Sequence, residues 1–484
     1  MSYTINQVQP PLEFIPPAFN PAVHTVARSL LPFWMNFGAG ISHVEADQVE
    51  ILVDLYRQFQ SGKTRFMLAF RHPSTDDPLC LASLLWQHVP QVARRQGVRL
   101  RQPVHAHFMY DRGIPLWAGS AAGWLYSRLG GTPIHRGKID RAGLRSVRHI
   151  FANGKLPIAA APEGATNGHN EIMSPLEPGI AQMGFWCAED LHQAGRTEAV
   201  LIVPIWIQYR YVESPWQPVE KLLAQLEADT GLARMQPDNP PPELSVTTRK
   251  LMREASSADQ PSIARLYARL YLLGEHLLTV MEQHYAQFYR GTATPIDPGN
   301  APEGEGTDPR EFTARLQALL NTALRVAEEY FEIQPKGSMI DRCRRLEQAG
   351  WDRIFREDIK HIEALSPLER GLADRIAEEA NLRMWHMRLV ESFVAVTGRY
   401  VLEKPTAERF AETTLLIWDM IARIKGESPF KRPRLGKQSA HITVGQPISV
   451  SDRWETYQSS RRAAKQAVSD LTQDLQTALE KMMG

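Results

Sequence analysis

The chain has 484 residues, of which 55 are basic and 54 acidic, so its formal net charge is +1. This balance lacks the basic excess of many nucleic-acid-binding proteins, and we expect no nucleic-acid partner. The length exceeds that of one ordinary core and predicts two or three domains. Three separated cysteines without metal-ligand spacing favour a reducing, cytoplasmic compartment: Cys80, Cys187 and Cys343.

The N-terminal region is polar and proline-rich, and it lacks the basic and apolar segments of a secretory signal. The most apolar early window, residues 29–41, contains Pro32 and Asn36. It is shorter than the ~20 residues that cross a bilayer. We therefore expect no transmembrane helix, although this window could lie peripherally on the inner face of a membrane.

Short apolar runs alternate with helical patterns between residues 63 and 210. The runs predict buried strands, because each is continuous, apolar and only a few residues long: residues 64–70, 103–110, 155–161 and 199–207. The segments between them have helical spacing. This alternation predicts an α/β fold whose mostly parallel sheet is flanked by helices.

A large all-helical insertion interrupts this pattern. Residues 261–289, for example, place apolar side chains at steps of three and four, and a Gly/Pro-rich linker follows at residues 291–309. Residues 440–450 return to a strand pattern before a terminal helix, and one lone strand must join a sheet elsewhere. We therefore predict an α/β domain with an N-terminal helical segment over residues 1–214, a helical insertion over 215–436, and a returning strand and helix over 437–484.

The stretch RHPSTDDP places His72 and Asp77 where a predicted strand meets a predicted helix. A carboxylate that fixes the tautomer of an imidazole turns it into a useful general base. Asp77, which precedes Pro78, is also typical of a helix N-cap followed by proline at the first helical position. Both roles remain open from the residues alone.

Four motifs in order resemble those of the glycerolipid acyltransferases, the family that includes 1-acylglycerol-3-phosphate acyltransferase. They are RHPSTDDP, GGTPIHRGKIDR, LPIAAAPEGATNG and VLIVPIWI, and HITVGQPISV resembles the family's closing strand. The resemblance implies that His72 and Asp77 form the catalytic HX4D pair. It also implies substrate-binding roles for Arg136, Glu163 and Gly164.

The chain departs from the family pattern at two positions. Arg71 stands where the family usually has asparagine, and Ala-Thr-Asn at residues 165–167 replaces the usual Thr-Arg after Gly164. One cationic contact with an acceptor phosphate is thereby lost. Because a guanidinium binds phosphate in bidentate geometry, nearby cations could replace it: Arg71, Arg136, Lys138 and Arg141.

The resemblance implies an O-acyltransferase of phospholipid biosynthesis that needs no cofactor and no metal. Its donor would be an acyl thioester, either acyl-CoA or an acyl carrier protein, and its acceptor a glycerolipid hydroxyl. Among acceptors, 1-acylglycerol-3-phosphate is preferred because Arg136 is retained, and glycerol-3-phosphate or another lipid alcohol remains open. Free backbone amides at the helix start after RHPSTDDP would act as oxyanion donors.

Two other functions remain open from the sequence. A metal-dependent hydrolase could use His72 and Asp77 together with His105 and His107, which share one face of a predicted strand. A non-catalytic lipid-binding scaffold is suggested by the missing arginine. A further segment, residues 169–171, could either line the pocket or form a polar surface loop.

Overall fold

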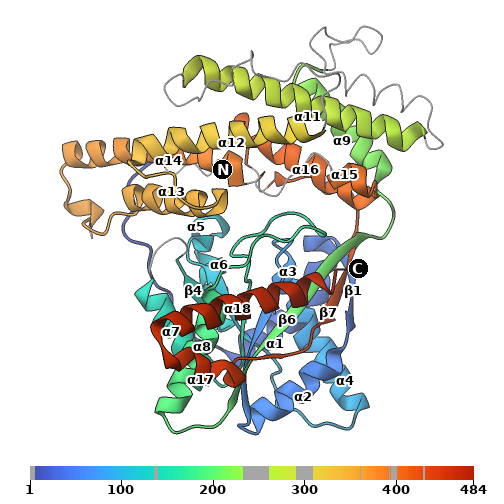
Figure 1. Ribbon diagram of the computed structural model, residues 1–484, viewed down its shortest axis with the longest axis vertical. Coiled ribbons are helices and arrows are strands. Elements are labelled where there is room, and N and C mark those ends of the chain that lie inside the picture. Colours follow the sequence, from blue (N-terminus) through green and yellow to red (C-terminus); the bar gives the residue numbers. More distant parts are fainter. Residues whose placement is uncertain are drawn as a thin grey trace. The chain divides into compact units, whose positions relative to one another are not determined.

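The computed structural model describes residues 6–135, 140–232, 261–289, 309–359, 361–391, 393, 400–428 and 431–483. The chain forms two compact units. The α/β unit contains Leu12–Val212 and Lys437–Gly484, and the helical unit contains Met1–Pro11 and Glu213–Gly436. Figure 1 shows a sheet flanked by helices in the first unit and stacked helices in the second, which confirms the predicted fold class.

The α/β unit is built on one eight-stranded sheet in the order β1-β7-β6-β2-β5-β3-β4, with β8 paired to β6. The strands are β1 (Ile41–Asp47), β2 (Thr64–Phe70), β3 (His107–Asp111), β4 (Thr132–Ile134), β5 (Ile158–Ala160), β6 (Ala199–Tyr211), β7 (Gln438–Val444) and β8 (Ile448–Ser449). Strands β2 to β6 are mutually parallel, whereas β7 runs antiparallel to β6. The carboxyl ends of β2, β5 and β6 therefore meet at one edge of the sheet.

Helices cover both faces of this sheet. They are α1 (Pro21–Phe33), α2 (Val49–Gln60), α3 (Asp77–Ser83), α4 (Val89–Arg95), α5 (Ile114–Ala118), α6 (Ser120–Arg128), α7 (Arg141–Asn153), α8 (Gly179–Gln193), α17 (Trp454–Ser459) and α18 (Arg461–Glu480). The central strand β2 is buried on both sides, as a strand inside a parallel sheet should be. Its Phe66 and Leu68 join the core formed with α2, α3 and α4, whereas Met67 and Ala69 join the core formed with α7, α8 and α18.

The helical unit contains α9 (Trp216–Asp229), α11 (Pro261–Phe288), α12 (Pro309–Phe331), α13 (Met339–Ile354), α14 (Pro367–Glu391), α15 (Tyr400–Glu403) and α16 (Ala407–Ile424). No strand occurs among the residues described in this unit. The predicted linker at residues 291–309 lies almost wholly outside the described residues. The insertion begins after β6 and ends before β7, and these connections are adjacent because the Val212 amide donates to the Lys437 carbonyl at 3.0 Å.

The domain boundaries differ from the sequence prediction at the N-terminus. Residues up to Pro11 belong to the helical unit instead of the α/β unit. The Val8 amide donates to Asp374 Oδ1 at 2.9 Å, and Gln9 forms a parallel bridge with Phe355. Because these partners are far away in the sequence, no local pattern in the polar, proline-rich N-terminal segment could predict the contacts.

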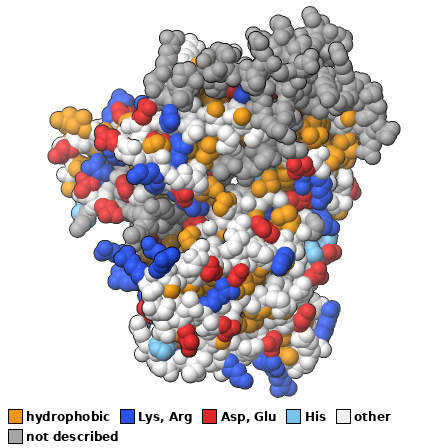
Figure 2. All heavy atoms as spheres, viewed as in Figure 1, with side chains coloured by type: hydrophobic (Ala, Val, Ile, Leu, Met, Phe, Trp, Pro, Cys, Tyr) orange, Lys and Arg blue, Asp and Glu red, His pale blue; other side chains and the backbone are white. Residues whose placement is uncertain are grey.

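The surface carries charges of both signs. Figure 2 shows acidic and basic side chains interspersed over the face in view, in keeping with a net charge of +1. Among the described residues, every helix is either too short or too polar to cross a membrane.

Candidate active site

His72 and Asp77 face each other across the turn that follows β2. His72 Nδ1 lies 2.7 Å from Asp77 Oδ2. The Asp77 side chain is fully buried, whereas that of His72 is 22% exposed. Because a carboxylate only accepts, the hydrogen sits on Nδ1, and Nε2 carries the lone pair in the neutral ring. Nε2 forms no hydrogen bond with any residue that the structure describes, so it is the ring atom available to a substrate.

Asp77 is stabilised by donors from three directions. Besides His72, the Ser74 amide donates to Oδ2 at 3.0 Å and the Tyr209 hydroxyl donates to Oδ1 at 2.6 Å. Burial and the adjacent Asp77 charge raise the pKa of Tyr209 well above its usual value, so this hydroxyl stays protonated and remains a donor. A buried carboxylate needs such partners, because an unpaired buried charge is strongly unfavourable.

The N-cap prediction for Asp77 is wrong. Helix α3 begins at Asp77 itself, its N-cap is Asp76, and no side chain caps its amides. Both oxygens of Asp77 are occupied by the donors described above. The predicted oxyanion donors are also occupied, because the amides at the helix start bond within the turn: those of Asp76, Asp77, Leu79 and Cys80.

Glu163 follows β5 at the same edge of the sheet and joins two loops. Its Oε1 accepts from the His72 amide at 2.9 Å, and its Oε2 accepts from the Ser174 amide at 2.9 Å and from Asn167 Nδ2 at 3.1 Å. Only 2% of Glu163 is exposed. Burial raises the pKa of this carboxyl, while Arg71 and the two amides act in the opposite direction. The geometry makes Glu163 a support for the His72 backbone, whereas substrate contact stays a prediction.

Gly164 has a φ of +74°, in the left-handed region that favours glycine. Its amide donates to the Ala161 carbonyl at 3.3 Å and closes a tight turn after β5. The turn brings Asn167 back to Glu163. Asn167, one of the three residues that depart from the family pattern, also donates to the Ile172 carbonyl at 2.6 Å and thus holds the loop in place.

Arg71 occupies a different position from the one that a phosphate contact requires. Its side chain is fully buried, and its guanidinium lies 4.4 Å from the centre of the Trp206 ring. It donates to the carbonyls of His169, Asn170 and Ile172. The expected phosphate contact is therefore corrected to a structural one, because the guanidinium anchors a buried loop.

Burial excludes one of the two alternatives for the segment that contains Arg71's partners, whereas pocket lining stays a prediction. His169 is 1% exposed and Asn170 is 8% exposed, so the segment is not a polar surface loop. Asn170 Oδ1 accepts from the Tyr209 amide at 2.7 Å, which ties the loop to β6. The loop therefore supports the site by connecting it to the strand that supplies Tyr209.

Arg136 and Lys138 lie outside the described residues, so their substrate-binding roles stay predictions. The residues on either side are well held. Asp140 Oδ2 accepts from the His135 amide at 2.9 Å and pairs with Arg112, and its Oδ1 accepts from the Gly143 amide at 3.0 Å. Asp140 therefore connects His135, directly after β4, with the start of α7.

His105 and His107, proposed as ligands of a metal site, form hydrogen bonds with other groups. His105 Nδ1 accepts from Trp86 Nε1 at 3.0 Å, and its Nε2 lies 2.8 Å from the Leu129 carbonyl. His107 Nδ1 lies 2.8 Å from the Gly130 carbonyl. Within the described ranges, no three His, Cys, Asp or Glu side chains are grouped so that they could hold a metal ion. This geometry gives the metal-hydrolase alternative no support.

Sequence reasoning missed Tyr209, Ser174 and Asn167 as parts of the site. Tyr209 lies near the end of β6, 132 residues from Asp77, and contacts it only because β6 pairs with β2. The sequence indicates Tyr209 only as an aromatic residue with a hydroxyl group near the carboxyl end of a buried strand. Ser174 contributes a backbone amide, which no residue type can reveal.

The comparisons with known proteins agree with this geometry. No curated protein matches the chain. Residues 49–208 match the family model described as Acyltransferase, a stretch that holds strands β2 to β5, most of β6, and the residues His72, Asp77 and Glu163. These residues therefore form a domain of the Acyltransferase family, which makes the protein an acyltransferase and confirms its resemblance to the glycerolipid acyltransferases.

Proposed function

We propose that the protein moves a fatty acyl chain from an acyl thioester to a glycerolipid hydroxyl, with His72 as the general base. The observation that carries this proposal is the 2.7 Å contact between His72 Nδ1 and the buried Asp77, which leaves Nε2 as the hydrogen-bond acceptor of a partly exposed ring. The donor is acyl-CoA or an acyl carrier protein. The acceptor is 1-acylglycerol-3-phosphate.

The reaction needs one proton to be moved twice. The acceptor hydroxyl donates to His72 Nε2, and its proton passes to that nitrogen as the oxygen attacks the thioester carbonyl. Asp77 stabilises the resulting imidazolium. The carbon–sulfur bond then breaks, and the leaving thiolate takes the proton, so that an ester and a thiol are formed. Such base catalysis is worth ~10²- to 10⁴-fold, and positioning of the two substrates supplies the rest.

The phosphate contact is assigned to Arg136 on the family resemblance. Strand β4 ends at Ile134, two residues before Arg136, and runs parallel to β3. Through β3 and β5, it is also parallel to β2, which leads to His72. The loops after β2 and β4 therefore leave the sheet at the same edge, as a site for one acceptor molecule requires.

A membrane surface is the proposed source of the lipid acceptor. Helix α1 and the π-helical segment after it, Trp34–Ala39, expose five large apolar side chains: Val26, Leu30, Phe33, Trp34 and Phe37, each at least 58% exposed. We call this set the α1 patch. Exposed aromatic and aliphatic groups of this kind insert into the interfacial region of a bilayer. Helix α1 also packs against α3, the helix that begins with Asp77.

The test is acyl transfer by the full-length chain from palmitoyl-CoA or palmitoyl-acyl carrier protein to a panel of acceptors. The panel contains 1-acylglycerol-3-phosphate, glycerol-3-phosphate and monoacylglycerol. His72→Ala should lower the rate by ~10²- to 10⁴-fold in a protein that stays folded. Because the substitution removes one donor from the buried Asp77, it should also cost about 1–3 kcal/mol of stability. His149→Ala, at an exposed histidine of α7, is the matched control.

Three results would contradict the proposal. Full transfer by a folded His72→Ala protein would remove His72 as the base. Equal use of monoacylglycerol and 1-acylglycerol-3-phosphate would remove the phosphate contact. Wild-type protein that binds these lipids but transfers nothing from either donor would support the scaffold alternative instead.

A further inference from the structure

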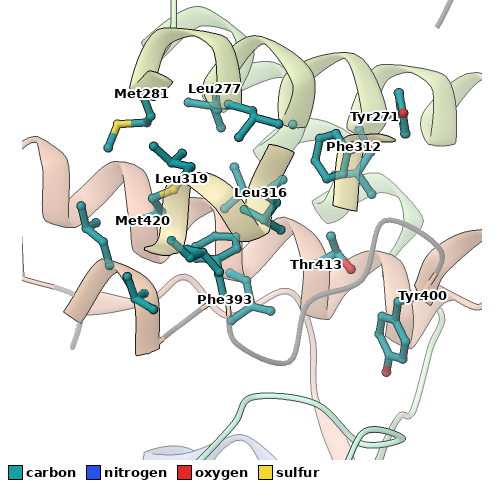
Figure 3. Close-up of a pocket in the computed structure, with 18 of the residues that line it drawn as sticks. Tyr271, Leu277, Met281, Phe312, Leu316, Leu319, Phe393, Tyr400, Thr413 and Met420 are labelled. Atoms are coloured by element: carbon teal, nitrogen blue, oxygen red, sulfur yellow. The ribbon is translucent and has the colours of Figure 1, made fainter. Parts of the chain in front are cut away.

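The helical unit contains an apolar cavity that the acyltransferase site does not explain. It lies among α11, α12 and α16 and is completed by the end of α14, by Phe393 and by α15 (Figure 3). Its volume is about 120 Å³. Every residue that lines it belongs to the helical unit.

The lining is the kind that binds an apolar molecule. It is made chiefly of Leu, Met, Ile, Val and Phe side chains, as in sites that bind apolar ligands. Protein interiors are close-packed, and an unfilled apolar volume destabilises the helices around it. A ligand that fills this space would therefore gain both burial and contacts. The two methionines, Met281 and Met420, can adapt to a flexible chain.

The two ends of the cavity differ in chemistry. Figure 3 shows Leu277, Met281 and Met420 toward one end, and Tyr271, Thr413 and Tyr400 toward the other. The direction of α11 agrees, because Tyr271 and Met281 are ten residues apart along it, or about 15 Å. The Thr413 hydroxyl donates to the Arg409 carbonyl and the Tyr400 hydroxyl to Glu412, while the Tyr285 hydroxyl, beyond Met281, is bonded to His386. The chemical difference between the ends therefore depends on the Tyr267 hydroxyl, four residues before Tyr271 on α11.

A further hydroxyl lines the cavity without a protein partner. The Tyr267 oxygen is buried and has no hydrogen-bond partner among the residues that the structure describes. Burial raises the pKa of Tyr267 to about 12, so the group remains a donor at neutral pH. An unpaired buried hydroxyl is unfavourable, which a carbonyl or carboxylate oxygen of a ligand would relieve. Near this end, the Arg409 guanidinium lies 4.3 Å from the centre of the Tyr400 ring.

We propose that this cavity binds a long-chain fatty acyl group, with the hydrocarbon among the leucines and methionines and the carboxyl or carbonyl head toward the Tyr267 hydroxyl. This is a second lipid site, beyond the acyl-transfer chemistry of His72. It gives the insertion a function of its own, and ligand binding at this site does not depend on the proposed transfer reaction.

The experiment is a fluorescence titration of the full-length chain with cis-parinaric acid. Wild-type protein should bind it saturably, one molecule per chain. Gly274→Leu should weaken binding by about tenfold, because the new side chain fills part of the cavity. A Cβ at this position would meet Phe312 at 3.5 Å, an ordinary contact, so the helix tolerates the change. The matched control is Val280→Leu, on the exposed side of α11, which should bind normally.

Further measurements identify the source of the acyl chain and distinguish this site from the transferase centre. Palmitate, palmitoyl-CoA and 1-acylglycerol-3-phosphate are tested as competitors, and the strongest identifies the natural carrier of the chain. His72→Ala should keep the wild-type affinity for cis-parinaric acid. Because this binding needs no turnover, it survives even where the proposed transfer reaction fails.

A second variant keeps the test decisive if Gly274→Leu misfolds, which circular dichroism would show. Tyr267→Phe should not lower stability, since its buried hydroxyl has no partner in the described part of the chain, and should weaken binding several-fold. Saturable binding reduced by a cavity variant but not by Val280→Leu supports the site. The proposal is overturned by wild-type protein that does not bind the probe, by equal affinity of the folded cavity variants and the control, or by loss of binding in His72→Ala.

Discussion

The Tyr209 hydroxyl donates a 2.6 Å hydrogen bond to Asp77 Oδ1, on the side of the carboxylate opposite His72. This contact joins β6 to the turn after β2, and it satisfies an oxygen that is otherwise sealed from water. Tyr209 thus serves as a positioning residue for the base. Its hydroxyl also lies 3.4 Å from Cys80 Sγ, within the same buried cluster.

Tyr209→Phe should lower both stability and activity. Removal of one donor from a buried carboxylate costs about 1–3 kcal/mol of unfolding free energy. The rate should fall by roughly tenfold, less than for His72→Ala, because the imidazole keeps its carboxylate but loses a fixed orientation. Urea unfolding and initial transfer rates measure the two effects. The control is Tyr110→Phe, since the buried Tyr110 hydroxyl has no partner in the described part of the chain. Equal rates for both variants would contradict the role of Tyr209.

Glu163→Gln should weaken the site although it preserves size. Both oxygens of this carboxylate accept from N–H donors, so the amide nitrogen of glutamine must face one of these donors. We expect a loss of about 1–3 kcal/mol in stability and a lower kcat, because the His72 backbone loses part of its support. Melting curves and transfer rates test this against Glu13→Gln, at an exposed position. An unchanged kcat in Glu163→Gln would show that His72 is held without Glu163.

The buried strands could be predicted from the sequence because burial on both faces leaves a continuous apolar run, as in β2 and β6. Edge strand β1 was not predictable in this way. It carries polar residues throughout, and it is a strand because it pairs with β7, nearly 400 residues later. The terminal helix was predicted as one element, but it divides into α17 and α18 at Ser460, which is extended and caps α18.

The site was predictable only in its local part. His72 and Asp77 are five positions apart, so their contact is a property of one turn. The capping alternative for Asp77 fails because the helix begins at Asp77 itself and both carboxylate oxygens are occupied, one of them by Tyr209 from β6. Arg71 shows the same limit. A cation beside a motif suggests phosphate, but burial against Trp206 and three carbonyls assigns it to the fold.

The α1 patch should govern membrane binding. Phe33 and Phe37 have ring centres 4.9 Å apart and are both more than 60% exposed. The double variant Phe33→Ala/Phe37→Ala should bind anionic phospholipid vesicles at least about tenfold more weakly, because two large apolar groups no longer enter the interface. Its melting temperature should not change. The matched control is Leu372→Ala/Leu382→Ala, at exposed leucines of α14. Equal vesicle sedimentation of the two double variants would contradict the assignment.

His105 should make the α/β unit sensitive to acid. Burial lowers the pKa of His105 to about 3, whereas an unfolded histidine titrates near its usual 6.5. Between these values the unfolded chain binds a proton that the folded chain does not, so stability falls as the pH drops below about 6.5, by up to roughly 1.4 kcal/mol per pH unit. Above that range His105 contributes no pH dependence.

Hydrogen exchange of the β2 amides from pH 7 to pH 4 measures the slope. His105→Asn, which can still accept from Trp86, should have a smaller slope than wild type. Because His24 contacts His105 and its pKa is also lowered by burial, part of the slope should remain. His149→Asn, at an exposed site, should match the wild type, and an unaltered slope in His105→Asn would mean that the buried ring does not stay neutral in acid.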